Sequence, residues 1–126
     1  MRRSPLKPVP FEVQSETLDG VRVIAVSGEL DLNTAPQLEE PLAAALESEG
    51  PALVIDLADC EFIDSTGIAL IVRAWQRLNN VAGQDGSRFA LCCVNDQVRR
   101  LLDITGLESS IPTHTSRDEA LAELRG

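Results

Sequence analysis

Strand-like apolar runs alternate with helix-like segments along this chain, and that alternation restricts its possible folds more than any other feature. Short β-rich runs are expected at residues 12–18, 21–27, 51–57, 88–94 and 110–115. Helical patterns separate the later runs, at about 34–49, 66–79 and 95–106, and a last helix follows Ser116. Such alternation favours right-handed crossovers between parallel strands. We therefore predict an α/β fold of order ββαβαβαβα, with a mixed, mostly parallel β-sheet and four helices.

Turn and cap residues support most of these boundaries. Asp19-Gly20 predicts a two-residue hairpin with an antiparallel edge, because both turn positions need a positive φ. The run from Ser116 to Glu119 has the capping-box pattern of a helix start. Pro41 conflicts with a helix that runs to about Glu49 from a cap at Asn33 or Thr34, because proline removes a hydrogen bond inside a helix. We expect a kink at Pro41 or a later helix boundary.

The chain length and the terminal segments predict one domain. A chain of 126 residues can bury a core without a disulfide or a metal. The basic, proline-containing residues 1–10 are expected to form a flexible arm, and residues 11–126 the folded domain. The sequence has no apolar run long enough to span a membrane and no visible signal peptide, so a cytoplasmic protein is predicted.

Charge and composition disfavour several classes of function. A net charge of -9 repels phosphate backbones, so nucleic-acid binding is disfavoured; the acidic surface suits a basic protein partner or serves solubility alone. Cys60, Cys92 and Cys93 lack the spacing of a disulfide framework or a zinc site, and Cys92 and Cys93 are expected to pack on opposite faces of one strand. His114 is the single histidine, and nothing near it resembles a nucleophile elbow. With no phosphate-binding glycine motif either, we predict no enzymatic activity, no cofactor and no metal.

The stretch from Cys60 to Ile68 holds the main candidate site. It follows the most buried strand and opens a helix, and partners of open α/β sheets meet the carboxyl ends of the strands. Asp64 or Ser65 is expected to cap the helix, and the Ser65 hydroxyl is also a candidate for covalent modification; the two roles are compatible. A phosphate on Ser65 would add about -1.5 to -2 charges.

Two neighbouring segments complete the candidate site. In the helix after Ser65, the core face is expected to carry the residues Ile68, Ile71, Val72, Trp75 and Asn79, with Leu78 at its edge. Leu70 falls on the opposite face and is a candidate docking residue, although single exposed leucines are common. Asp31, at the end of the second strand, is expected to lie near Ser65 at the rim of the sheet that the strand ends form. Its role there is that of a site residue or of a turn residue.

These residues resemble a known family, the anti-sigma factor antagonists, which are single-domain STAS proteins of bacteria. The resemblance covers about residues 11–125. It is carried by four segments: Gly28-Glu29-Leu30-Asp31, Val54-Ile55-Asp56-Leu57, Phe62-Ile63-Asp64-Ser65-Thr66-Gly67 and Leu101-Leu102-Asp103-Ile104-Thr105-Gly106-Leu107. It implies the STAS-domain fold and a role in partner switching in transcription regulation, in stress response or sporulation.

The resemblance also implies a mechanism. In this family the unphosphorylated protein binds an anti-sigma factor that is also a serine kinase, and the sigma factor is released. The kinase phosphorylates the serine of a D-S-[ST]-G motif, which matches Ser65, and binding is lost until a PP2C-type phosphatase removes the phosphate. Thr66 matches the second hydroxyl position, and Asp31 an acid near the serine. Partner contacts are therefore expected at Asp31, Asp64, Thr66, Gly67 and Leu70.

Two other classes of function remain open at this point. One is a STAS interaction subunit of a lipid-transport or stress-signalling complex that does not use a phosphoswitch. The other is a small hydrolase or a nucleotide-binding protein, against which the absent phosphate loop and the single histidine argue.

Overall fold

A computed structural model describes residues 10–47, 52–82, 88–92, 94–106 and 111–125 of the chain. The elements are β1 (Glu12–Leu18), β2 (Val21–Leu30), α1 (Ala35–Leu46), β3 (Leu53–Ile63), α2 (Ser65–Ala82), β4 (Phe89–Cys92), α3 (Asp96–Thr105), β5 (Thr113–His114) and α4 (Arg117–Arg125). The predicted order is confirmed. The expected arm at residues 1–10 lies outside the described residues, except for Pro10, and so does Cys93.

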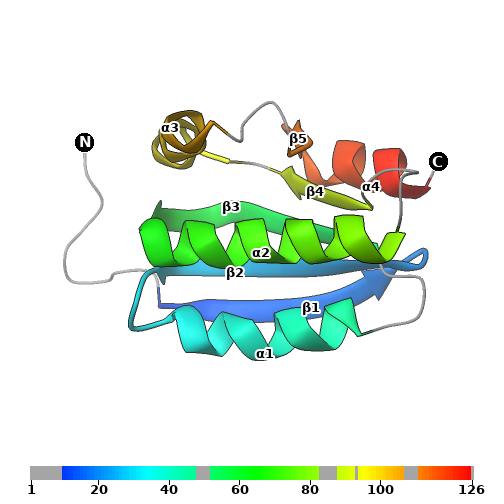
Figure 1. Cartoon of the computed structure of the whole chain (residues 1–126), viewed down its shortest axis with the longest axis horizontal. Coiled ribbons are helices and arrows are strands. Elements are labelled where there is room, and N and C mark those ends of the chain that lie inside the picture. The colour runs from blue at the N-terminus through cyan, green and yellow to red at the C-terminus, as the bar shows by residue number, and fades with distance from the viewer. Residues whose placement is uncertain (1–9, 48–51, 83–87, 93, 107–110, 126) are drawn as a thin grey trace.

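The strands form one sheet in the order β1-β2-β3-β4-β5. β1 and β2 pair antiparallel through a turn in which Asp19 and Gly20 both have positive φ, which confirms the predicted hairpin. The other pairs are parallel. Since successive parallel strands are direct neighbours, right-handed crossovers place α1, α2 and α3 on the same face of the sheet. Figure 1 shows α1 and α2 side by side in front of the strands.

Each face of the sheet has its own apolar core. Residues of α1, α2 and α3 share one buried cluster with the sheet, which includes Leu38, Ile71 and Leu102. On the other face, Ala120, Leu121 and Leu124 of α4 pack against a smaller cluster that includes Val23 and Val54. A sheet covered on both faces explains why the central strands read as continuous apolar runs.

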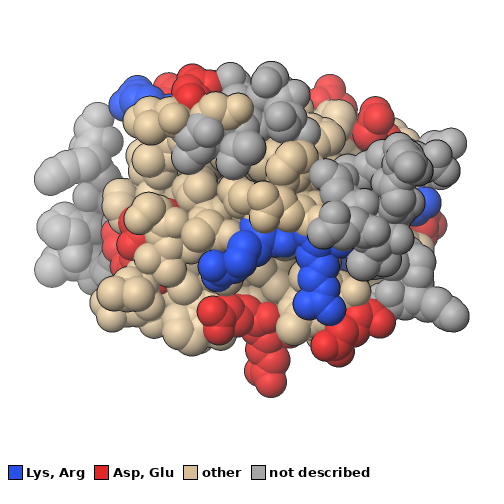
Figure 2. All heavy atoms as spheres, viewed as in Figure 1, with Lys and Arg blue, Asp and Glu red and all other residues tan. Residues whose placement is uncertain are grey.

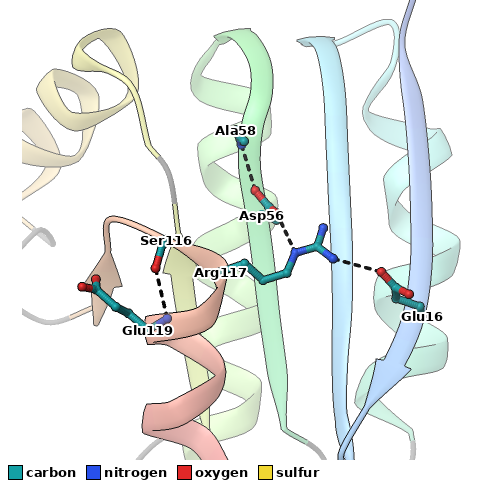
Figure 3. A network of polar contacts seen from close by, with 6 residues as sticks. All are labelled: Glu16, Asp56, Ala58, Ser116, Arg117 and Glu119. Carbon is teal, nitrogen blue, oxygen red and sulfur yellow. Dashed lines mark hydrogen bonds and ion pairs between the residues drawn. The ribbon is translucent and has the colours of Figure 1, made fainter.

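An ion-pair network ties α4 to the sheet. The Arg117 side chain at the start of α4 lies between two carboxylates, with Nε 2.9 Å from Asp56 Oδ2 and Nη1 2.9 Å from Glu16 Oε2 (Figure 3). Partial burial opposes the charge on Arg117, but the two carboxylates outweigh it and raise the pKa of the guanidinium. Ser116 Oγ accepts from the Glu119 backbone N–H, so the predicted cap of this helix is confirmed.

Several predicted boundaries are wrong. α1 continues through Pro41 and ends at Leu46, although Pro41 has no N–H to donate to the turn before it. The strand predicted at 110–115 is reduced to Thr113 and His114. The largest error concerns β3, which continues through residues 58–63, beyond the end predicted at Leu57.

Candidate functional site

β3 carries two extra residues relative to its partner β2. The pairing passes from Ala25–Asp56 to Ser27–Asp59 and from Gly28–Cys60 to Glu29–Phe62, so each step adds one residue to β3. Such bulges bend a strand and change the direction of its side chains. They bring Leu30 and Ile63 into register, so both strands end together, directly before Asp31 and Asp64.

Asp64 is the cap of α2. Its Oδ1 accepts from the backbone N–H groups of Thr66 (2.9 Å) and Gly67 (3.1 Å), and its carbonyl oxygen accepts from Ile68. These bonds satisfy donors that a helix start leaves unpaired. Of the two predicted cap residues, Asp64 therefore takes the role, and the Ser65 hydroxyl is not needed for it.

The same Asp64 side chain also holds the loop that follows β2. Its Oδ2 accepts from the Leu32 backbone N–H at 3.2 Å, and its own N–H donates to the Leu30 carbonyl at 3.1 Å. One carboxylate thus links the start of α2 to the β2–α1 loop.

Asp31 shapes that loop from within. Its Oδ1 accepts from the backbone N–H groups of Asn33 (3.0 Å) and Thr34 (3.1 Å), and its backbone N–H donates to Thr34 Oγ1. Thr34 Oγ1 in turn donates to the Glu29 carbonyl at 2.8 Å. Asp31 is half-buried and acts as a turn residue, and it lies at the same rim as Asp64, as predicted.

Ser65 is exposed at the first position of α2, while the neighbouring Thr66 is half-buried. Within the described part of the chain, the Ser65 hydroxyl makes no hydrogen bond. A side chain that is exposed and does no structural work can change its charge without disturbing the fold. Of the two hydroxyls, Ser65 is therefore the more accessible to a modifying enzyme.

Gly67 fixes how closely α2 approaches β2. A Cβ on Gly67 would lie 2.8 Å from Leu30 Cγ and 3.1 Å from the Leu30 carbonyl oxygen. Leu30 is fully buried, so it has no room to give way. Gly67 is itself buried, and the structure gives it a packing role beneath the rim.

Two polar side chains of the β4–α3 segment brace the outer edge of β3, where β4 has already ended. The Gln97 amide accepts from the Ile63 N–H at 3.1 Å and donates to the Ile63 carbonyl at 2.9 Å. Asn95 Nδ2 donates to the Cys60 carbonyl while its Oδ1 caps α3 at Val98. The amides replace a neighbouring strand. The sequence suggested a capping role for Asn95 and no role for Gln97.

Two exposed apolar side chains flank this rim and were missed by sequence reasoning. Leu32 is 70% exposed in the loop held by Asp64, and Phe62 is 40% exposed next to Glu29 at the end of β3. Large apolar side chains this open are candidates for contact with another protein. Only the register of β3 and the position of the loop show them to be exposed.

The predicted position of Leu70 is wrong. Leu70 is only 6% exposed and belongs to the core on the α1 side of α2. α1 packs beside α2 as well as on the sheet, so the buried stripe of α2 is wider than expected and runs through Ile68, Leu70, Ile71, Ala74 and Leu78. Val72 and Trp75, predicted for the core face, are half-buried at its edge.

The arrangement does not assemble a hydrolase site from the described residues. His114 of β5 pairs with Cys92 of β4, and Cys92 pairs with Asp56 of β3. His114 therefore lies at the level of Asp56, several residues before the end of β3 that leads to Ser65. No group of three or more metal-ligating side chains occurs in the described ranges. Burial raises the pKa of the Cys60 thiol to about 11, which keeps it protonated at neutral pH.

Comparison with known proteins gives the family. The STAS domain family matches residues 12–120. The chain belongs to the STAS domain family. An anti-sigma F factor antagonist of Paenibacillus polymyxa is 32% identical over 115 residues, which cover 90% of this chain and 95% of that protein. An anti-sigma-B factor antagonist of Listeria monocytogenes is 34% identical over 103 residues, covering 82% of this chain and 86% of that protein.

Solved structures agree with this assignment. An anti-sigma factor antagonist from Mycobacterium paratuberculosis matches with a TM-score of 0.81 and 34% identity, over 93% of this STAS chain and 96% of that one. An anti-sigma-factor antagonist (STAS) domain protein from Planctomyces limnophilus matches with the same TM-score, 27% identity and 90% and 98% coverage. The expected resemblance and the expected fold are confirmed. Among the described helices, none is both long and apolar enough to cross a membrane.

Proposed function

We propose that this STAS protein is an anti-sigma factor antagonist whose docking surface is the rim formed by the β2–α1 loop and the start of α2. Its partner is an anti-sigma factor that is also a serine kinase, and binding of the unphosphorylated chain releases the sigma factor. The relatives named above, which carry this function in their names, support the general role. The exposed Ser65 hydroxyl, freed from capping by Asp64, supports the switch.

The switch is a change of charge at the rim. In the kinase step, Ser65 Oγ takes the γ-phosphoryl group of ATP, its proton is lost, and ADP leaves. The phosphate adds about -1.5 to -2 charges beside Asp64 and close to the loop that Asp31 shapes. A PP2C-type phosphatase reverses the step by hydrolysis, which returns the hydroxyl and releases inorganic phosphate. In this scheme the chain is the substrate of both enzymes and not itself a catalyst, and it works in the cytoplasm with the transcription machinery.

Exposed apolar side chains next to Ser65 explain why such a charge opposes binding. A docking partner must remove water from Leu32, which is 70% exposed and bonded through its N–H to the cap residue that precedes Ser65. A phosphate dianion at the same place holds water strongly, and removing that water without new partners is costly. Loss of about 1.4 kcal/mol of binding free energy weakens the affinity tenfold.

The test uses the anti-sigma factor of the native cell and two variants. Ser65→Ala is expected to bind as the unmodified chain does, and Ser65→Glu to bind at least tenfold more weakly by calorimetry. Mass spectrometry after incubation with the partner and ATP is expected to find one phosphate, on Ser65. The control Thr66→Ala removes the other hydroxyl and is expected to leave phosphorylation intact.

Equal affinity of Ser65→Ala and Ser65→Glu would overturn the charge mechanism. Co-purification with transporter or stress-complex subunits in that case would support the alternative, a STAS interaction subunit without a phosphoswitch.

A further inference from the structure

A groove is lined by residues of α1 and α2. Figure 1 shows these two helices on the face of the molecule that Figure 2 draws as spheres. The volume of the groove is about 490 Å3, within the range of small binding sites. Leu42, Leu70 and Ala74 form a nearly buried apolar floor, and the half-buried Leu46 and the exposed Ala43 extend it along α1. A floor of this kind, open along its length, suits an elongated occupant.

The two walls of the groove carry opposite charges. Glu39 stands on α1, whereas Arg73 and Arg77 stand one helical turn apart on α2. Figure 2 shows basic side chains gathered over α2 and acidic side chains over α1. Neither Arg73 nor Arg77 forms an ion pair or a side-chain hydrogen bond within the described part of the chain. In a protein of net charge -9, two neighbouring cations that have no partner among the described residues are positioned for an anionic group from outside.

The groove and the proposed switch share one helix. Arg73 and Arg77 follow Ser65 by eight and twelve residues, which places them about 12 and 18 Å along the axis of α2. At 100° per residue they lie about 80° and 120° around the helix from Ser65, on the same half of its surface. A protein that covers Ser65 can therefore reach both arginines without leaving α2.

We propose that this groove is a second docking site for the anti-sigma factor that binds at Ser65, and that an acidic amphipathic helix of that partner fills it. The inference rests on the proposed function. A crease between two helices accepts a third helix through its apolar face. The apolar face of the incoming helix covers Leu42, Leu70 and Ala74, and its acidic stripe faces Arg73 and Arg77. The groove holds the partner beside Ser65, while a phosphate on Ser65 opposes binding at the β2–α1 loop and the start of α2.

The experiment compares single charge reversals in the full chain. Arg77→Glu is expected to weaken binding of the unphosphorylated chain to its anti-sigma factor at least tenfold by calorimetry. Arg100→Glu makes the same charge change at an exposed position of α3, outside the groove, and is expected to change the affinity less than twofold. Urea unfolding of both variants checks that each is as stable as the parent chain. Hydrogen exchange of the complex is expected to slow at α1 and α2 together.

Each other outcome is decisive. Equal weakening by Arg77→Glu and Arg100→Glu would mean that net charge alone acts, and the groove proposal fails. If Ser65→Glu abolishes binding but Arg77→Glu does not weaken it, the groove proposal fails and the proposed function stands. If Arg77→Glu weakens binding but Ser65→Glu does not, the groove is a docking site and the phosphoswitch fails. Slower exchange at the groove in the free chain at high concentration would instead assign it to a second copy of the chain.

Discussion

Asp64 Oδ2 accepts a hydrogen bond from the backbone nitrogen of Leu32 at 3.2 Å, while Oδ1 of the same carboxylate caps α2. The segment that carries the Ser65 hydroxyl and the loop that carries the most exposed leucine of the rim are therefore held by a single side chain. Asp64 sets their relative position and leaves the Ser65 hydroxyl without a structural task. A mutation at Asp64 should change both parts of the rim at once.

Removing the Asp64 carboxylate should destabilise the fold and loosen the loop. Asp64→Ala is expected to lower the free energy of unfolding by about 1–2 kcal/mol, because backbone donors of α2 lose their acceptor. Asp64→Asn should retain more of the cap, since an amide oxygen also accepts. Urea unfolding measures the stability, and hydrogen exchange of the Leu32 amide, expected to be faster in Asp64→Ala, measures the loop.

Asp59→Ala provides a matched control for this prediction. It removes the same charge from an exposed position of β3 and is expected to change the stability by less than about 0.5 kcal/mol. If the two alanine variants were equally stable, the capping role of Asp64 would be refuted.

Gly67 should resist substitution although it lies inside a helix. Alanine is favoured over glycine there by about 1 kcal/mol from helix propensity alone. The added Cβ would lie 2.8 Å from Leu30 Cγ, however, and overpacking of this kind costs about 1–3 kcal/mol. Gly67→Ala is therefore expected to be destabilising in urea unfolding.

A double-mutant cycle separates the clash from other causes. Leu30→Ala alone leaves a cavity and costs about 2–5 kcal/mol. Combined with Gly67→Ala it should cost less than the sum of the two single changes, because the shorter side chain makes room for the new Cβ. Strict additivity would contradict the packing explanation.

The order of the elements could be predicted from the sequence because its signals are local. The apolar periodicity of α3 and the cap at Asn95 specify that helix before any tertiary contact is known. The positive φ values required at Asp19 and Gly20 specify the hairpin in the same way. Such features need only neighbouring residues, and the structure confirms them.

The end of β3 could not be predicted because its two bulges break the alternation by which a strand is recognised. Ala58 and Asp59 are exposed and Cys60 is buried, so the residues before Ile63 lack a period of two. Their strand conformation depends on pairing with β2 and on the side chains of Asn95 and Gln97.

The burial of Leu70 could not be predicted from the sequence either. A helical projection shows which residues share a face, but it does not show that α1 covers a second face of α2. In the candidate site, the motif around Ser65 could be located from sequence, whereas the exposure of Leu32 and Phe62 follows from tertiary structure alone.

The Arg117 network should contribute unequally through its two ion pairs. Arg117→Ala leaves the Asp56 carboxylate, only 7% exposed, without its cation and is expected to cost about 1–3 kcal/mol. Glu16→Ala removes a carboxylate that is mostly in water and should cost less than about 1 kcal/mol. Urea unfolding of both variants at one pH gives the comparison.

Added salt provides an internal control for the Arg117 prediction. It should reduce the effect of Glu16→Ala more than that of Arg117→Ala, because salt screens exposed pairs more strongly than buried ones. A Glu16→Ala variant that loses as much stability as Arg117→Ala would show that burial of Asp56 does not govern the network.

Cys60 should make the fold sensitive to alkaline pH. Burial raises the pKa of its thiol from 9.0 to about 11, and the protonated thiol donates to the Phe62 carbonyl at 3.5 Å. The unfolded chain therefore loses this proton at lower pH than the folded chain. The protonated thiol stabilises the fold fully below a pH of about 9, and this contribution is lost as the pH rises toward about 11.

The variant Cys60→Ala isolates this contribution. It should be less stable than the parent at neutral pH, because a buried group is removed, but it lacks the thiol that titrates. The difference in unfolding free energy between parent and variant is therefore expected to shrink as the pH rises from about 9 to about 11. Urea unfolding across this interval measures the difference, and circular dichroism checks that both chains remain folded. A difference that stays constant with pH would mean that the Cys60 thiol ionises equally easily in the folded and unfolded chains.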